Sequence, residues 1–270
     1  MTVAGHAGLR PSARSGAAVL AALIVLAVLA PLVAPYAADA IDLAHRRGAP
    51  SMAHWFGTDE LGRDLLTRVL FGARISLSIG LVSAAVSGAI GVAIGATAGY
   101  AGRLTDDLLM RFTDAILSVP RLPLLMIAAT VLQPGLPLLI VLVGAAGWME
   151  TARVVRAEVL SIKAGDFVTA ARAVGATPWR VVVRHVLPGV VPAATVATTL
   201  AIGRSILLES ALSFLGVGVQ PPTASWGNML YQAQTTMSTE PWLAVFPGVF
   251  IFVTVICCNE MGDALGGGRR

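Results

Sequence analysis

The chain has 270 residues and a net charge of +4, with 56% apolar but only 13% charged residues. Soluble domains have about 25% charged residues, so the composition excludes an ordinary soluble protein and predicts a bundle of membrane-spanning helices. No basic run carries interleaved aromatic residues, which argues against nucleic-acid binding.

Apolar runs along the chain predict an all-α membrane protein with six transmembrane helices. The first run resembles a signal peptide because Arg10 and Arg14 precede it, but it is longer than the roughly 7–15 residues of a signal core. We therefore expect it to be retained as the first span. The spans are expected at roughly residues 17–36, 75–99, 108–132, 136–155, 189–212 and 242–262.

Lysine and arginine residues gather on one side of this arrangement, which predicts that side to be cytosolic. They crowd residues 156–188, whereas residues 213–241 on the opposite side have none. The loop 37–74 disagrees with the rule, because five arginines fall outside. The expected organisation is a cytosolic tail 1–16, a first transmembrane helix 17–36, an external loop 37–74, a core 75–265 that includes the cytosolic loop 156–188, and a cytosolic tail 266–270.

The external loop contains a segment with the pattern of an amphipathic helix. Thr58 is a favourable N-cap, and acidic residues follow it in the first turn. Asp59 and Arg63, and likewise Asp64 and Arg68, stand four residues apart with the acid first, which is the favourable order on a helix. The pattern predicts a helix at the outer surface that runs into span two. It leaves open whether this helix is a salt-bridged connector or a functional element.

Span two contains glycines spaced four residues apart, at Gly91, Gly95 and Gly99. This spacing places small residues along one helix face and favours close approach of a neighbouring helix. We expect a structural role for these glycines.

Residues 166–188 predict two short helices outside the bilayer, between spans four and five. Asp166 can cap the first helix, and Gly175 can end it in a left-handed conformation. Thr177 and Pro178 can then open the second helix. Spacing alone fits both a hairpin that rests on the membrane and one that docks on another protein. One face of the first helix is apolar and small at its centre, and it comprises Phe167, Ala170, Ala171 and Val174.

Charged residues inside the predicted spans are costly and usually have a structural or functional partner. Arg204 and Glu209 lie in span five about 140° apart around the helix, so we do not expect them to pair with each other. Glu150 stands three residues before Arg153, a spacing that allows pairing along one helix. Two roles are possible for Arg204 and Glu209. They can bond to other helices or subunits, or they can line a polar translocation path.

The sequence lacks the motifs of several catalytic and metal-binding classes. The only lysine is Lys163, and Ile162 precedes it, so a P-loop for ATP is absent. No His-Glu-x-x-His motif occurs, and the histidines lie outside the apolar spans. Cys257 and Cys258 are adjacent within an apolar run and read as small apolar fillers. We expect no catalytic, cofactor-binding or metal-binding residues in this chain.

Three stretches, in order along the chain, resemble permeases of the dipeptide, oligopeptide and nickel branch of ABC importers. The first runs from Phe56 to Asp64 and is followed by Arg68, Gly72, Arg74 and Ser76. The second is Ala170-Ala171-x-x-x-Gly175 followed by Leu187-Pro188. The third runs from Glu209 to Pro222 and continues with Ser-Trp-Gly-Asn at 225–228. Together the resemblance covers roughly residues 50–265.

The resemblance implies that the loop 156–188 docks on an ATP-hydrolysing subunit. Thr169 stands where the broad family pattern has glutamate, and His185 stands where it has isoleucine. The resemblance assigns an external motif to Asp59, Gly62, Arg63 and Asp64. It assigns the ATPase-coupling surface to Asp166, Phe167, Ala170, Ala171, Val174 and Gly175.

The function that the resemblance implies is the permease subunit of an ABC importer in the bacterial cytoplasmic membrane, with both termini cytosolic. Its expected partners are a second homologous permease, two P-loop ATPases that bind ATP and magnesium, and an extracytoplasmic binding protein that delivers di- or oligopeptides. Nickel chelates, haem and glutathione are alternative cargoes. An ion-coupled secondary transporter is the rival class, but the sequence shows no inverted repeat, midplane carboxylate or broken helix to support it. A membrane-bound enzyme is the weakest alternative.

Overall fold

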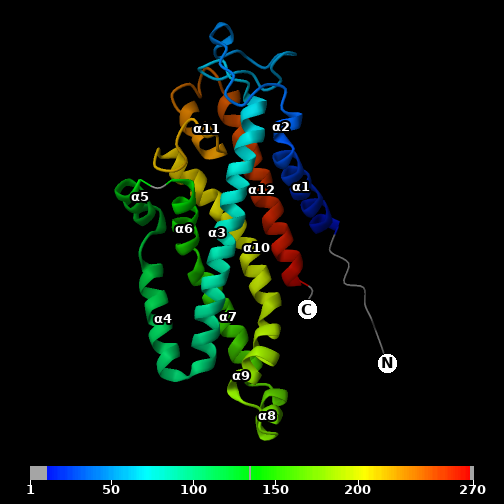
Figure 1. The fold of residues 1–270 in the computed structure, drawn as a ribbon, viewed down its shortest axis with the longest axis vertical. Helices are drawn as coiled ribbons and strands as arrows, with labels where there is room; N and C mark the ends of the chain where they lie inside the picture. The colour runs from blue at the N-terminus through cyan, green and yellow to red at the C-terminus, as the bar shows by residue number, and fades with distance from the viewer. Residues whose placement is uncertain (1–10, 134, 268–270) are drawn as a thin grey trace.

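The computed structural model describes residues 11–133 and 135–267, and the part of the chain within these ranges is helical, without a β-strand. Predictions that involve Arg10, Pro134 or residues 268–270 lie outside the described residues. The helices, shown in Figure 1, are α1 (Pro11–Val28), α2 (Ala30–Val33), α3 (Leu65–Ala101), α4 (Arg103–Ser118), α5 (Arg121–Leu132), α6 (Leu136–Ala145), α7 (Trp148–Lys163), α8 (Asp166–Ala173), α9 (Pro178–Val181), α10 (Leu187–Phe214), α11 (Trp226–Ala233) and α12 (Trp242–Gly267), with a 3-10 turn at Leu43–His45 and a π-helical turn at Val182–Val186.

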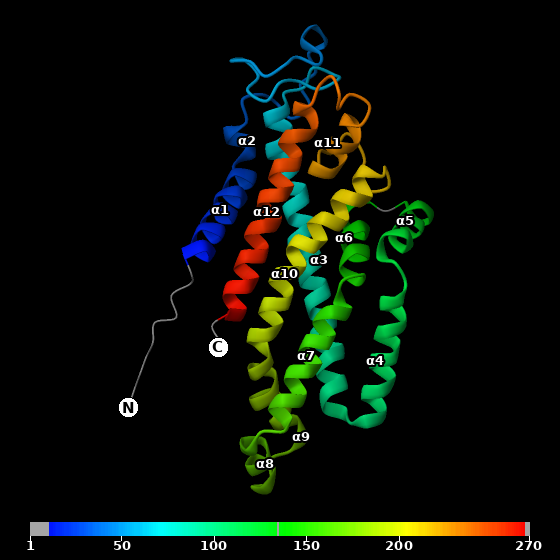
Figure 2. The same ribbon diagram turned by 180° about the vertical axis from the view of Figure 1, so that it is seen from behind.

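Helix α3 forms the centre of the bundle and packs mainly on α7 and α10 (Figures 1 and 2). A Cβ atom on Gly95 would lie 2.4 Å from the carbonyl oxygen of Ala152 in α7, so only glycine permits this approach. Gly91 and Gly99 lie equally close to α7, against Thr151 and Val159. The predicted structural role of this glycine spacing is confirmed.

Three segments of the described chain are long and apolar enough to cross a membrane, namely Leu65–Ala101, Pro178–Phe214 and Trp242–Gly266. Two helix pairs qualify only when each pair is taken together: α4 with α5, bent by 81°, and α6 with α7, bent by 42°. The structure therefore contains three to five candidate spans. The first predicted span is not among them, because the apolar part of α1, Arg14–Val28, is too short on its own.

Both bends have a local cause in the sequence. The α4–α5 break falls at Val119-Pro120, where proline disfavours the helical conformation of the residue before it. The α6–α7 break falls at Ala146-Gly147, and glycine is the poorest helix former after proline. The expectation that the chain has no broken helix is wrong.

The two loop regions that the sequence singled out lie at opposite ends of the molecule. Residues 37–64 fold over one end of α3 beside α11, and α8 and α9 lie at the far end, below α7 and α10 (Figure 1). We call residues 37–64 the cap and residues 164–186 the island. Trp226 of α11 is fully buried under the cap, and its indole nitrogen donates a 3.1 Å hydrogen bond to the carbonyl oxygen of Val69 in α3.

Candidate functional site

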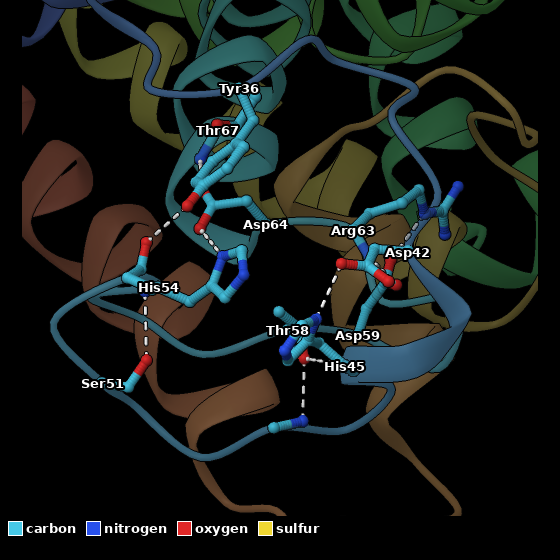
Figure 3. Close-up of polar contacts among 12 residues, drawn as sticks. Tyr36, Asp42, His45, Ser51, His54, Thr58, Asp59, Arg63, Asp64 and Thr67 are labelled. Carbon is cyan, nitrogen blue, oxygen red and sulfur yellow. Dashed lines mark hydrogen bonds and ion pairs between the residues drawn. The ribbon is translucent and has the colours of Figure 1, made fainter.

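The cap is an irregular segment that polar contacts hold in one shape (Figure 3). The buried hydroxyl of Thr58 accepts a 2.7 Å hydrogen bond from the amide of Gly48 and donates to the carbonyl oxygen of His45. The ring of Phe56 stacks on Phe246 of α12, with centroids 3.8 Å apart. The cap is thereby fastened both to itself and to the bundle.

Asp59 is the centre of the predicted external motif. Its carboxylate binds Arg63 at 2.7 Å and Arg68 at 3.2 Å, and all three side chains are buried. It also accepts hydrogen bonds from the amides of Leu61 and Arg63, at 2.9 and 3.0 Å. One carboxylate thus compensates two buried guanidinium groups, an arrangement that needs such additional hydrogen bonds to be stable. Gly62, at φ +74°, passes directly against the backbone of Asp42.

Asp64, not Thr58, is the N-cap of the following helix. Its carboxylate accepts a 2.8 Å hydrogen bond from the amide of Thr67 and contacts Nδ1 of His54 at 3.0 Å (Figure 3). The predicted helix start at Thr58 is wrong, and so is the predicted pair of Asp64 with Arg68, because Arg68 reaches Asp59 instead. The four residues of the external motif nevertheless lie together at the start of α3.

Glu209 lies fully buried in α10, within a cage of serine hydroxyls. Ser213 and Ser225 donate to its carboxylate at 2.7 and 2.9 Å, and Ser76 of α3 lies 3.4 Å away. Ser225 is also the N-cap of α11 and accepts from the amide of Asn228 at 3.2 Å. Glu209 therefore ties α10 to α3 and to the loop that leads into α11.

Arg204, one and a half turns from Glu209 along α10, faces a different partner. It pairs with Glu150 of α7, and Glu150 also accepts from Arg121 of α5 at 2.8 Å. The expectation that Arg204 and Glu209 do not pair is confirmed. The expected pairing of Glu150 with Arg153 is wrong, because Arg153 binds Asp114 of α4 at 2.5 Å.

The island presents the predicted apolar face of α8 outward. Phe167 and Val174 are exposed, as is Ala170, and Ala171 is half-buried. Val168, one residue along from Phe167, is instead fully buried and anchors α8 to the bundle. The arrangement leaves small and large apolar groups free on the outer side.

The ends of the two island helices have the capping residues that the sequence predicts. Gly175, two residues after the end of α8, has φ +88°, and the amide of Ala176 donates to the carbonyl oxygen of Ala171 at 3.0 Å. Thr177 caps α9 by accepting from the amide of Arg180 at 3.3 Å, with Pro178 at the first helical position. Both predictions are confirmed. Asp166 differs slightly, because it forms the first turn of α8 rather than preceding it.

The predicted absence of catalytic and metal sites remains a prediction. Among residues 11–133 and 135–267, no group of three or more His, Cys, Asp or Glu side chains is placed to hold a metal ion. Cys257 and Cys258 are buried free thiols. The single lysine, Lys163, donates to the backbone carbonyl of Tyr100 at 2.9 Å and thus caps the last turn of α3.

Sequence reasoning missed Arg121 and the serine cage. Arg121 directly follows Pro120, which lies inside a predicted span. Because proline breaks a helix, this position could have indicated the break and the charged residue beside it. Ser76 and Ser225 both belong to stretches that resemble permeases, but nothing in their spacing indicates that they meet at Glu209. Only the packing of α3, α10 and α11 brings them together.

Comparison with known families gives two matches. The family described as "Binding-protein-dependent transport system inner membrane component" matches residues 91–266, and the family "N-terminal TM domain of oligopeptide transport permease C" matches residues 10–50. The first match covers α4 to α11 and therefore the island together with Glu209, Ser213 and Ser225 of the serine cage, whereas Ser76 lies before it.

Curated relatives align over almost the whole chain. The dipeptide transport system permease protein DppC of Bacillus subtilis is 39% identical, covering 94% of this chain and 79% of its own length. The oligopeptide transport system permease protein OppC of Haemophilus influenzae is 38% identical, covering 92% and 80%. The glutathione transport system permease protein GsiD of Escherichia coli is 41% identical, covering 90% and 80%.

Proposed function

Because the chain belongs to the family of binding-protein-dependent transport system inner membrane components, we propose that it is the permease subunit of an ATP-driven ABC importer. In this proposal the chain forms half of the translocation path and a second homologous permease forms the other half. An extracytoplasmic binding protein delivers the cargo. Two P-loop ATPase subunits bind the ATP and magnesium for which this chain has no motif. The relatives support a di- or oligopeptide cargo, with glutathione as the specific alternative.

The exposed face of α8 is the observation that carries the coupling role. A short helix held to the bundle by Val168, with Phe167 and Val174 pointing outward, offers an apolar anchor to a groove on another protein. Ala170 and Ala171 between them allow the partner's backbone to approach closely. In this proposal the ATPase closes around α8 when it binds ATP and turns the path between its inward-facing and outward-facing forms.

We assign the opposite end to delivery of cargo. The cap and α11 would face the binding protein, and Arg204 would line the path. Glu209 differs from Arg204 because its carboxylate is enclosed by serines of its own chain. Its proposed role is to order the outer gate by tying the loop before α11 to α3 and α10.

For topology we propose six spans, with α1 and α2 forming the first and each bent pair forming one. Both termini would then be cytosolic, which the concentration of Arg and Lys in residues 156–188 supports. Single cysteines at Thr169 and Thr223, which are both exposed, test this in a background without Cys257 and Cys258. Thr223→Cys should react with an impermeant maleimide from outside, and Thr169→Cys should not. The reverse pattern would invert the topology.

Uptake of labelled di- and tripeptides by proteoliposomes that contain the complete importer tests the function itself. Uptake should require ATP together with the loaded binding protein. Uptake that runs on a proton gradient without ATP would contradict the proposal and favour the secondary-transporter class. Competition by unlabelled glutathione separates the two proposed cargo classes.

A further inference from the structure

Arg121 and Arg204 share one carboxylate. Arg121 binds one oxygen of Glu150 at 2.8 Å, and Arg204 binds the other oxygen. Among the described residues, the ion pairs of both arginines go to Glu150 alone. The next acidic residue on α7, Glu158, lies about two turns farther along and has an interaction of its own. Because arginine stays protonated, this cluster carries a net charge of about +1.

The two arginines of the cluster border an open cavity of about 340 Å³ between α5, α6 and α10. This volume lies within the range of ligand-binding pockets. The side chains of Arg121 and Arg204 are 27% and 47% exposed, so their charge is accessible from the cavity rather than sealed inside the bundle. Glu150, which is 40% exposed, lines a neighbouring cavity together with Arg204. The rest of the lining is mainly apolar and includes Leu122, Val143, Leu207 and Leu208.

Both broken helices open onto this cavity. Arg121 is the first residue of α5, directly after the 81° bend, and Glu150 lies in the first turn of α7, after the 42° bend. Gly147, within the second break, lines the cavity itself. Irregular backbone at membrane depth is tolerated where it borders a water-filled cavity, and broken helices of this kind form substrate sites in transporters.

We propose that Arg121 and Arg204 form a subsite for the terminal carboxylate of the cargo, and that Glu150 holds both guanidinium groups in place between cargo molecules. The inference rests on the proposed function, since a peptide supplies that carboxylate. Each guanidinium has five N–H donors, so binding to Glu150 leaves donors free for a second carboxylate. The net charge attracts an anion, and the competing Glu150 keeps it from being held too tightly to leave.

The test compares uptake of one peptide with a free C-terminal carboxylate and the same peptide as its C-terminal amide. The complete importer in proteoliposomes is used, with the same binding protein throughout, so a changed acid-to-amide ratio reports on the permease. Arg204→Gln should lower this ratio about tenfold, by reducing uptake of the acid while leaving uptake of the amide unchanged. This is the effect expected for the loss of one charge-assisted hydrogen bond. Arg204→Lys should retain part of the preference.

Glu150→Gln should shift the ratio the other way when uptake is measured well below saturating peptide, because it removes the competing carboxylate and raises the net charge of the cluster. This opposite sign keeps the test decisive if Arg204→Gln fails to accumulate. Arg153→Gln is the matched control, since it breaks an exposed ion pair on the same helix, with Asp114 of α4, and should leave the ratio unchanged.

Equal loss of acid and amide uptake in Arg204→Gln would overturn the proposal. The cluster would then hold helices together, or bind a carboxylate of the second permease, and co-purification of that permease would fall as well. If the acid-to-amide ratio is unchanged in Arg204→Gln and the wild type takes up peptide with ATP, the subsite is wrong and the proposed function stands. Absence of ATP-dependent peptide uptake in the wild type overturns the proposed cargo, and the subsite falls with it.

Discussion

The cap and the island differ in whether the side chains that the sequence singled out are buried and paired within this chain. Where the cap joins α3, the charged groups of Asp59 and Arg63 in the cap and of Arg68 in α3 are buried and satisfy one another. In the island, Phe167 and Val174 are 53% and 87% exposed and have little of their own chain to pack against. The buried charges of the first region find their partners within this chain, although its surface also exposes Met52 and Trp55. The second region has no such buried charges among its described side chains and exposes apolar surface of the kind that marks an interaction site.

This contrast separates two kinds of defect. Damage to the cap should lower the stability of the protein itself, because Asp59 is the carboxylate that compensates both buried guanidinium groups. Damage to the island should leave the folded chain intact and weaken its association with the ATPase. The variants below test this separation in order of decreasing expected effect.

Asp59→Asn should destabilise the cap most. It leaves Arg63 and Arg68 buried without a carboxylate, at a cost of about 3–5 kcal/mol. Thermal unfolding of the purified protein in detergent measures the loss. Glu60→Gln, at an exposed neighbouring position, should unfold like the wild type. Equal unfolding temperatures for Asp59→Asn and Glu60→Gln would show that the buried pairs do not hold the cap.

Ala171→Glu should have the opposite profile. A charge on the small face of α8 would be buried without a partner in the ATPase groove, at a cost of about 2–5 kcal/mol of binding. Co-purification of the ATPase and peptide uptake should both fall, while the unfolding temperature stays unchanged. Thr169→Glu is the control, because it lies outside that face and restores the glutamate of the broad family pattern. Normal assembly and uptake in Ala171→Glu would rule out α8 as the coupling element.

Gly175→Val should act through the backbone alone. A Cβ atom at this position would meet no atom within 4 Å, so the expected cost of about 1–2 kcal/mol comes only from φ +88°. Faster hydrogen exchange in α8 and weaker ATPase binding are the readouts. Gly175→Asn should be milder, since asparagine tolerates the left-handed region. If Gly175→Asn and Gly175→Val were equally disruptive, the positive φ of Gly175 would not be the cause of the effect.

Thr177→Ala should have the smallest effect. It removes the side-chain cap of α9 and should cost about 1 kcal/mol. Hydrogen exchange across residues 178–186 should become faster, and Thr177→Ser should restore the wild-type rate. An effect on unfolding of the whole protein would contradict the view that the island is a local unit.

The island helix ends were predictable because their rules are local: a glycine at the end of α8 and a Thr-Pro pair at the start of α9 leave few alternatives. The start of α3 was not, because both Thr58 and Asp64 are good caps. The choice follows from tertiary contacts that use the Thr58 hydroxyl inside the cap.

The cluster around Glu150 escaped prediction for a related reason. Its members come from α5, α7 and α10, and the spacing along one helix favoured Arg153 as the partner. The number of unbroken spans was overestimated because the spans were predicted from the length of apolar runs. Val119-Pro120 and Ala146-Gly147 lie within such runs, although the helices break there. Hydropathy measures how apolar a segment is, and it carries little information about where the helix axis turns.

Helix α3 contains 37 residues and no proline, so it is an uninterrupted element about 55 Å long, well beyond the roughly 30 Å of a bilayer core. The helices beside it contain weak points: Pro192 lies within α10, Pro247 lies within α12, and α4–α5 and α6–α7 are bent. We therefore expect α3 to be the rigid element of the subunit, and the helices with a proline or a bend to move relative to it. Two spectroscopic labels on α3 should keep a constant separation through the transport cycle and provide the internal ruler against which every other displacement is measured.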